Sequence, residues 1–265
     1  MSTFFQHVIT LFRQEEFSTE PPLNTPFFGI LLPKHNIIIH CIPLLHKENL
    51  NTQFCAQLSD ESQLKGFKMI HLWEDVFFKQ RALVEARLLS LIGVRKRIHG
   101  RQTTIKRIDK IEASAFLNQH HLQQYVSSYY KYALVYKSEI VAVATFSKSR
   151  VMKDGVVPYR SYELIRFASK TGITVTGGLG KLLNYFIEQH QPAHIMTYAD
   201  RDWSMGEGYI KLGFTEVGKT PSQLFWVDPE SFERLPATSP FQQKYIQVFN
   251  AGNLKYVLDR RSQHS

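Results

Sequence analysis

Apolar residues in the first hundred positions gather into short runs that end at polar or turn-forming residues. Such runs are typical of strands, and we expect three of them, at residues 27–32, 37–41 and 68–73. Pro33 ends the first run, and a polar turn separates it from the second. Glu74 and Asp75 follow the third run, and acidic residues in a first turn complement the helix dipole. A helix is therefore expected over residues 75–92, with a short amphipathic helix within residues 1–17.

From about residue 100 the pattern changes to strands and helices in alternation. We expect strands at residues 103–108, 132–136, 140–147, 161–168, 193–199 and 223–227, the last of the series. We expect helices at residues 112–121, 180–189 and 204–212. His99 and Gly100 mark a turn and a candidate boundary with the first region. The order of these elements predicts an α/β (α+β) fold.

The composition limits the class of protein. The chain has 265 residues, of which 43% are hydrophobic, enough for one large core or two small ones. Its longest apolar stretches are interrupted by charge, and its first residues lack the features of a secretory signal, so we expect a cytoplasmic protein without a membrane span. Cys41 and Cys55 are too few for a disulfide scaffold and lack a second metal-spaced pair, so we expect reduced structural thiols and no metal site.

The net charge of +9 is unevenly distributed. One stretch, which we call the basic segment, has Asp109 as its only acid and contains Arg95, Lys96, Arg97, Arg101, Lys106, Arg107 and Lys110. Such a cluster can contact phosphates, which makes DNA or another nucleic acid a candidate partner. A solvated linker between two domains is the alternative interpretation.

A glycine-rich turn precedes an apolar run in the second region. Gly177, Gly178 and Gly180, with Leu179 between them and Lys181 after them, open the helix expected at residues 180–189. The first backbone N–H groups of a helix have no partner within it, and the helix dipole adds partial positive charge. This turn can therefore hold a pyrophosphate.

The order of elements over roughly residues 102–228 resembles the GNAT acyltransferase superfamily, a mixed sheet flanked by helices. The resemblance implies acetyl-CoA or another acyl-CoA as cofactor, with the glycine-rich turn as pyrophosphate loop. It also implies that the backbone at Phe167 and Ala168, on the central strand, pairs with the pantetheine arm. The sequence departs from the family at Val175, where a Gln or Arg usually begins the loop motif, and at Asp202, where an Asn is usual.

The same resemblance implies two catalytic residues. Glu163 on the central strand is the candidate general base for the attacking amine, and Tyr209 is the candidate acid for the departing thiolate. Glu163 is alternatively a solvent-side residue or a partner of Arg166, and Tyr209 is alternatively a core aromatic beside Phe214. Both alternatives stay open at the level of sequence.

Residues 70–75, with the preceding strand–turn–strand and the following helix, resemble the nuclease module of phage homing endonucleases related to very-short-patch repair endonucleases. That family places metal-binding carboxylates where this chain has Gly29 and, at or near the second position, His40, while His46 is compared with a histidine of its site. Neither Gly29 nor His40 supplies a carboxylate. We therefore expect a degenerate restriction-endonuclease-like module without nuclease activity.

The second resemblance extends through residues 198–204 and 249–256, and so covers nearly the whole chain from Phe27. It makes Asp200, Arg201 and Trp203 candidates to line a substrate or nucleic-acid pocket, with Trp203 stacking on a base. A structural ion pair of Asp200 with Arg201 and a core position for Trp203 are the alternatives.

These observations predict three regions: a degenerate nuclease-like module at residues 1–99, a GNAT-like domain at 100–228 and an extension at 229–265 that packs on it. The leading expectation is an N-acyltransferase that transfers an acyl group from acyl-CoA to an unidentified amine. The alternative is a non-catalytic DNA-binding protein derived from a homing-type endonuclease.

Overall fold

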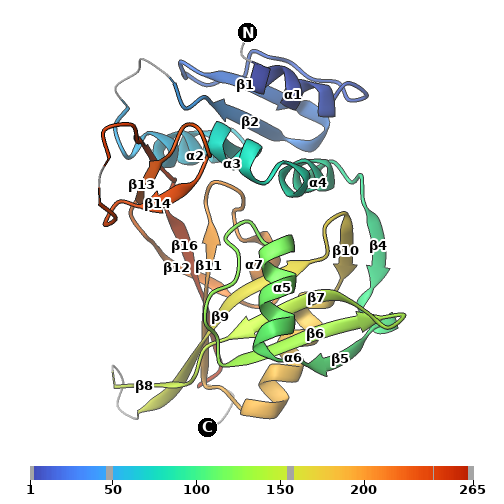
Figure 1. Cartoon of the computed structure of the whole chain (residues 1–265). Helices are drawn as coiled ribbons and strands as arrows, with labels where there is room; N and C mark the ends of the chain where they lie inside the picture. The colour runs from blue at the N-terminus through green and yellow to red at the C-terminus, as the bar shows by residue number, and fades with distance from the viewer. Residues whose placement is uncertain (1–2, 46–49, 154–157, 241, 262–265) are drawn as a thin grey trace. The chain divides into compact units, whose positions relative to one another are not determined.

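The computed structural model describes residues 3–45, 50–153, 158–240 and 242–261 (Figure 1). The chain forms two compact units, each made of separate segments. Unit 1 contains residues 1–85, 199–207 and 218–254, and unit 2 contains residues 86–198, 208–217 and 255–265. The regions expected at 1–99, 100–228 and 229–265 stay predictions.

Unit 1 begins with a short three-stranded sheet of order β1-β2-β3. Its elements are α1 (Thr3–Leu11), β1 (Phe28–Leu32), β2 (Ile37–Ile42), α2 (Phe54–Leu64), β3 (Lys68–Trp73) and α3 (Glu74–Lys79). β1 and β2 are antiparallel, whereas β2 and β3 are parallel and are connected through α2. Every residue of β2 is buried, as the continuous run of isoleucines predicts for a central strand.

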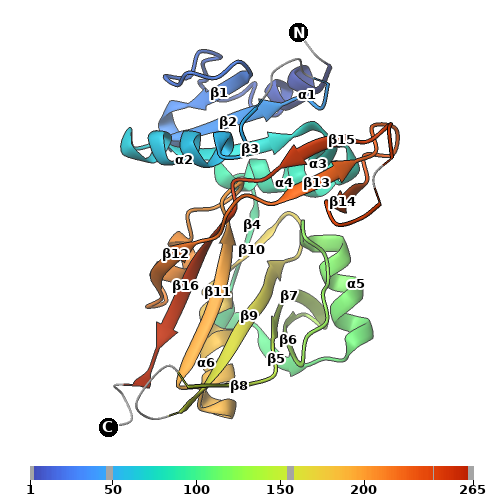
Figure 2. The same ribbon diagram turned by 90° about the vertical axis from the view of Figure 1, so that its left-hand side faces the viewer.

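A second small sheet, of order β14-β13-β15, completes unit 1 (Figure 2). Its strands are β13 (Leu224–Val227), β14 (Arg234–Pro236) and β15 (Ile246–Phe249). Val227, Val248 and Phe249 share one buried cluster with Ile42 and Trp73. The residues after 227 thus contribute to the core of this unit.

Unit 2 contains most of an eight-stranded sheet. Seven of its strands follow one another in the order β12-β16-β11-β9-β7-β6-β5, and the eighth, β8, pairs with β9. The strands are β5 (Thr104–Arg107), β6 (Tyr130–Tyr136), β7 (Glu139–Phe146), β8 (Arg150–Met152), β9 (Tyr159–Ser169), β11 (His194–Asp200), β12 (Thr215–Lys219) and β16 (Asn253–Asp259). β5, β6, β7 and β9 are successively antiparallel, and β9 and β11 are parallel. A parallel pair needs a crossover, which α6 (Gly178–His190) provides.

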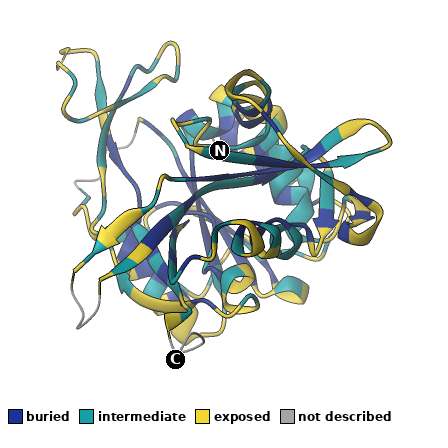
Figure 3. Ribbon diagram, turned by 90° about the horizontal axis from the view of Figure 1, so that it is seen from below, coloured by how far each residue is buried: buried dark blue, intermediate teal, exposed yellow. Residues whose placement is uncertain are grey.

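Helices cover both faces of this sheet. α5 (Lys110–His120) buries Ala113, Phe116 and Leu117 against Val143 and other small residues of one face. α6 lies on the opposite face, where Phe186 stacks on Phe146 with 3.9 Å between ring centroids. Buried residues follow the strands, whereas strand ends and turns are exposed (Figure 3). Among the described residues, no helix has the length and apolar character needed to cross a membrane.

Several elements differ from the sequence expectations. The helix expected over 75–92 is two helices, α3 and α4 (Arg81–Leu91), because the backbone of Gln80 leaves the helical region with φ of −131°. α2 was not expected, since its buried face includes Ser59 and Ser62 and so lacks an apolar stripe. Strand 223–227 is not the last, because β14, β15 and β16 follow it. β16 lies inside the large sheet between β12 and β11.

Candidate active site

The parallel pair β9 and β11 separates partway along its length. Register partners run only from Ser161 to Leu164 on β9, opposite residues 194–197 of β11, although β9 continues to Ser169. On its other side β9 pairs with β7 as far as Ser169. The backbone of Phe167 and Ala168 therefore has a ladder partner on β7 but none on β11, which leaves strand-edge N–H and C=O groups able to pair with an amide chain.

A β-bulge lies at the point of separation. Thr145 of β7 pairs with Arg166 and Phe146 pairs with Leu164, so Ile165 is an extra residue on β9. The bulge keeps Leu164 on the α6 face, with Phe146, and directs the preceding Glu163 to the α5 face. The Glu163 backbone is fixed there, because its N–H donates to Ser147 Oγ at 2.9 Å and its carbonyl accepts from Ser147 N at 2.9 Å.

The glycine-rich turn forms the N-terminus of α6, as the sequence predicts. Gly177 has φ of 73°, a conformation that favours glycine, and no side chain caps the helix. The first helical hydrogen bond runs from Lys181 N to Gly177 O at 3.0 Å. The N–H groups of Gly178, Leu179 and Gly180 therefore have no partner within the helix. With the helix dipole they provide donors suited to an anion.

Two of these glycines have a packing role as well. A Cβ on Gly178 would approach Val175 at 3.0 Å, and one on Gly180 would approach Leu212 at 3.0 Å. The spacing of the glycines thus follows from close contacts around α6. Lys181 has a separate task, because its ammonium donates to the carbonyls of Gly100, at 3.0 Å, and Thr103.

Tyr209 lies in the short helix α7 (Glu207–Ile210), and its ring contacts Phe214 and Tyr256 with centroids 5.7 Å away in both cases. Thr197 lies near the Tyr209 hydroxyl, and its own hydroxyl donates to Leu164 O at 2.9 Å. Burial raises the pKa of Tyr209, so the phenol is protonated at neutral pH. Tyr209 is thus both a packed aromatic and a proton donor near Thr197, the β11 residue at which the pairing with β9 ends.

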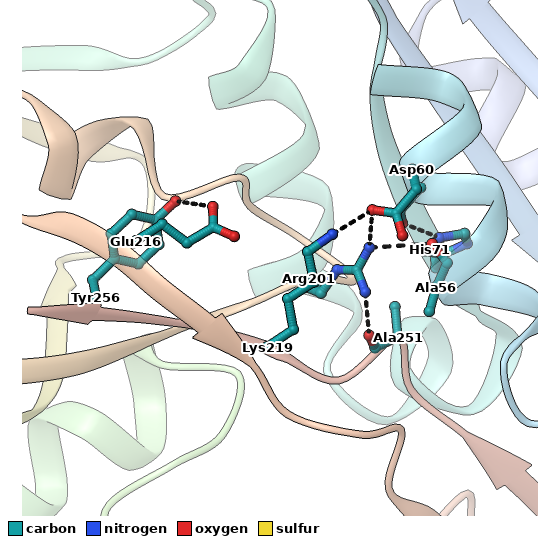
Figure 4. Close-up of polar contacts among 9 residues, drawn as sticks. Ala56, Asp60, His71, Arg201, Glu216, Lys219, Ala251 and Tyr256 are labelled. Carbon is teal, nitrogen blue, oxygen red and sulfur yellow. Dashed lines mark hydrogen bonds and ion pairs between the residues drawn. The ribbon is translucent and has the colours of Figure 1, made fainter. Parts of the chain in front are cut away.

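Tyr256 and Arg166 complete the surroundings of these elements. Tyr256 is fully buried on β16 and donates to Glu216 Oε2 at 3.5 Å (Figure 4). The Arg166 guanidinium donates to two backbone carbonyls, those of Gln124 at 3.2 Å and Ile165 at 3.0 Å. Arg166 therefore joins the segment after α5 to the bulge on β9.

Arg201 and Trp203 lie in unit 1, and both are buried, with 3% and 5% of their surface exposed. Arg201 Nη2 donates to Asp60 Oδ1 at 2.7 Å and to Ala56 O at 3.1 Å, and Nη1 donates to Ala251 O at 3.4 Å (Figure 4). Asp60 is thus an ion-pair partner that spacing along the sequence could not identify. Asp200 accepts from the backbone N–H of Asp202 at 3.0 Å, as in a turn.

Asp202, the other departure from the GNAT pattern, is also buried in unit 1. Its carboxyl accepts a hydrogen bond from Ala251 N at 2.8 Å. Burial, followed by the nearby carboxylate of Asp200, raises the pKa of Asp202 well above its ordinary value. This aspartate therefore has a structural position in the core of unit 1.

The basic segment is ordered rather than a linker. β4 (Lys96–His99) pairs in parallel with β10 (Ile173–Thr176), the strand that leads into α6. Lys96, Arg97 and Arg101 are exposed, whereas Arg95 is half-buried and donates to Ser90 O at 2.5 Å. The sequence identified the charge, but the pairing of β4 with β10 could not be predicted, because four polar-rich residues carry no strand pattern.

The positions that the nuclease resemblance compares with carboxylates lie side by side in unit 1. Gly29 of β1 is opposite His40 of β2, and His40 is opposite His71 of β3. A side chain at Gly29 would overlap the ring of Pro21. His46 lies outside the described residues. In the part of the chain that the structure describes, no group of three or more His, Cys, Asp or Glu side chains could hold a metal ion.

Both histidines of this row are buried and hydrogen-bonded. His40 Nε2 contacts Thr25 Oγ1 at 2.8 Å, the two Nδ1 atoms of His40 and His71 are 3.0 Å apart, and His71 Nε2 contacts Ser59 Oγ at 2.8 Å. Desolvation lowers the pKa of His40 to about 3 and that of His71 well below its ordinary value. All four ring nitrogens have protein partners, so both rings are neutral structural groups. Cys41 and Cys55 are buried and not disulfide-bonded, as expected.

The sequence matches no protein-family model and no curated protein. Solved structures similar to the chain include a GNAT family acetyltransferase from Elizabethkingia anophelis with acetyl-CoA bound, at a TM-score of 0.37 and 14% identity over 60% of this chain and 98% of that one. The ribosomal-protein-S18-alanine N-acetyltransferase from Escherichia coli has a TM-score of 0.37 and 15% identity, over 59% of this chain and 93% of its own. Arabidopsis thaliana Naa50, in complex with a bisubstrate analogue, has a TM-score of 0.40 and 10% identity, over 60% and 99%. Because these identities and scores are low, we base the functional proposal on the residues of the chain itself.

Proposed function

We propose that the chain is an acyl-CoA-dependent N-acyltransferase of the GNAT type. The observation that carries the proposal is the parallel pair β9 and β11, which separates after Leu164 while α6 crosses between the two strands. Separation leaves strand-edge donors and acceptors for an amide-containing arm, and the N-terminus of α6 offers donors for its phosphates. Tyr209 lies near Thr197, at the end of the pairing.

Each residue then has a definite role in the reaction. The N–H groups of residues 178–180 bind the pyrophosphate, and the backbone of Phe167 and Ala168 pairs with the pantetheine. The amine nitrogen attacks the thioester carbon, and Glu163 accepts the proton that the nitrogen loses. As the carbon–sulfur bond breaks, Tyr209 donates its proton to the leaving thiolate. We leave Lys181 out of the phosphate site, because two carbonyls hold its ammonium.

Calorimetric titration with acetyl-CoA and with CoA tests the proposal. Leu179→Glu places a negative charge in the first turn of α6, where it suits the helix dipole but repels a phosphate. We expect the wild type to bind both ligands and this variant to bind at least tenfold more weakly while remaining folded. Gly178→Glu adds bulk against Val175, so its folding must be checked by its melting temperature.

Gly218→Glu is the matched control, because a Cβ at Gly218 meets no atom within 4 Å and the position is remote in sequence from α6. It adds the same charge, and we expect it to leave binding unchanged. The proposal is wrong if the folded wild type binds neither ligand, or if Leu179→Glu and Gly218→Glu bind acetyl-CoA equally well.

The second candidate function is non-catalytic DNA binding by a chain derived from a homing-type endonuclease. The exposed cations of the basic segment, Lys96, Arg97 and Arg101, favour it. The N-terminal module would then be nuclease-like in fold and inactive, since Gly29 and His40 supply no carboxylate for a divalent ion. If this function holds, affinity for duplex DNA falls steeply with salt, and a Lys96→Ala, Arg97→Ala double variant binds every sequence more weakly. We keep a cytoplasmic location as a prediction.

A further inference from the structure

Unit 2 carries a second surface in which arginines and aromatic rings lie together on the α6 face of the sheet. Arg107 of β5 pairs in register with Tyr132 of β6, and cross-strand partners lie on the same face. Tyr132 Oη contacts His190 Nε2 at 2.8 Å, and the ring of Tyr130 lies 4.1 Å from that of His190. These rings place Arg107, Tyr130 and His190 at one end of α6.

A second arginine lies on the same face as these rings. Arg160 stands two residues before Tyr162 on β9, so the two side chains share one face of the sheet. The ring of Tyr162 lies 6.3 Å from that of Tyr130. Arg107 and Arg160 are exposed, so their charges are available to solvent. The combination provides two cations beside aromatic rings.

One ring of this group is open to solvent. Tyr129 is 55% exposed, the ring lies 4.7 Å from that of Tyr130 in an edge-to-face arrangement, and its backbone N–H donates to Phe146 O at 2.9 Å. The Tyr129 backbone is thus fixed on the sheet while the ring remains accessible. A large exposed aromatic held this way has no role in the core.

We propose that this surface, formed by Arg107, Tyr129, Tyr130, Arg160 and His190, binds single-stranded nucleic acid. Aromatic rings stack on unpaired bases without regard to sequence, and neighbouring cations contact the phosphates. The rings distinguish this partner from other polyanions, because an acidic protein or a duplex offers no free base faces. The surface is separate from the donors at the N-terminus of α6, so it does not depend on the proposed acyltransferase activity.

Fluorescence anisotropy with a labelled 15-nucleotide oligothymidylate tests the proposal. We expect binding that weakens as NaCl rises from 50 to 300 mM, since cation–phosphate contacts release counterions. Tyr129→Ala should weaken binding at least fivefold through loss of one stacked base. Tyr129→Phe keeps the ring and should bind like the wild type, and equal melting temperatures of the two variants show that folding is unaffected.

The contribution of the two arginines to binding is tested by replacing each with a residue of opposite charge. Arg107→Glu and Arg160→Glu should each weaken binding at least tenfold, whereas Lys211→Glu, at an exposed residue elsewhere in unit 2, should have a smaller effect for the same change in net charge. The proposal fails if the wild type does not bind the oligonucleotide at 50 mM NaCl. It also fails if Tyr129→Ala binds like Tyr129→Phe, or if a duplex or polyglutamate of equal charge binds as tightly as the single strand.

Discussion

Unit 1 and unit 2 each have polar groups where two parallel strands meet, but the two units differ in whether those groups form hydrogen bonds within the protein. In unit 1, the row across β2 and β3 joins Thr25, His40, His71 and Ser59 into one chain that occupies every ring nitrogen. In unit 2, β9 and β11 separate after Leu164, and the first N–H groups of α6 have no partner within the helix. A row whose donors and acceptors are satisfied internally stabilises a fold, whereas unpaired donors at a junction are available to a ligand.

The row of unit 1 also restricts what the positions Gly29 and His40 can accommodate. Pro21 occupies the space that a side chain at Gly29 would need, and His40 is held by Thr25 and His71. A metal ion would have to displace hydrogen bonds that the buried rings cannot replace with water. The hydrogen bonds and packing of this row therefore stabilise the fold of unit 1.

The largest effect expected from this comparison is acid destabilisation of unit 1. The folded-state pKa of His40 is lowered from 6.5 to about 3, so between these values the unfolded chain binds more protons and stability falls as pH falls. One proton is worth about 1.4 kcal/mol per pH unit, so we expect His40 alone to account for roughly 4 kcal/mol between pH 6.5 and 3. Urea unfolding at several pH values, followed by tryptophan fluorescence, measures this loss, because Trp73, Trp203 and Trp226 all lie in unit 1.

A matched pair of variants assigns that pH dependence. His40→Gln should make the unfolding free energy depend less steeply on pH below 6.5, because one of the two buried rings with a lowered pKa is gone and His71 remains. His7→Gln, at a partly exposed histidine of the same unit, should keep it. If both variants show the wild-type slope, the buried row is not the source of the acid sensitivity.

A smaller effect is expected when a carboxylate is introduced at Gly29. Gly29→Asp forces a side chain against Pro21 and buries a charge without a partner, so we expect a loss of about 2–3 kcal/mol in unfolding free energy. We also expect no cleavage of plasmid DNA with Mg²⁺ or Mn²⁺, because His40 still occupies the second position. Gly66→Asp is a control for the charge at a position without neighbours, although its φ of 81° adds backbone strain. Metal-dependent cleavage of DNA by Gly29→Asp would contradict this expectation. It would show that the hydrogen bonds of His40 and His71 can give way to a metal ion.

Sequence patterns located the second region well because its signals are local. The hairpin of β6 and β7, the helix α6 behind Gly177 and the strand β9 with Glu163 were all predicted within a few residues. The contacts that define the site were not predictable, since they join residues distant in the chain. The bulge at Ile165, the bond from Thr197 to Leu164 and the packing of Gly180 against Leu212 have no signature in the sequence.

The first region shows the converse limit. The strands β1, β2 and β3 were expected from apolar runs, but α2 was missed because Ser59 and Ser62 occupy its buried face. The reason for these polar residues lies in tertiary contacts: Ser59 binds His71 and Ser62 binds the carbonyl of Phe67. A helix whose buried face is polar is invisible to a search for hydrophobic periodicity.

The smallest effect expected distinguishes a satisfied hydroxyl from an unsatisfied one within unit 2. Thr145 and Thr197 are both buried on strands next to β9, with 0% and 2% of their surface exposed. Thr145 Oγ1 has no hydrogen-bond partner among the described residues, whereas Thr197 Oγ1 donates to Leu164 O at 2.9 Å. Thr→Val replaces the hydroxyl by a methyl group of similar size at each position, so the pair isolates the hydrogen bond from the packing.

We expect opposite signs for these two variants. Thr145→Val removes a buried polar atom that nothing satisfies, so the unfolding free energy should stay equal or rise by up to about 1 kcal/mol. Thr197→Val removes the hydrogen bond to Leu164 O, and should lower the unfolding free energy by about 1–2 kcal/mol. Urea unfolding at pH 7.5 measures both. Equal losses of unfolding free energy in the two variants would mean that Thr145 has a bound water or ligand as its partner. The polar groups beside the β9 bulge would then be satisfied, like those of the histidine row in unit 1.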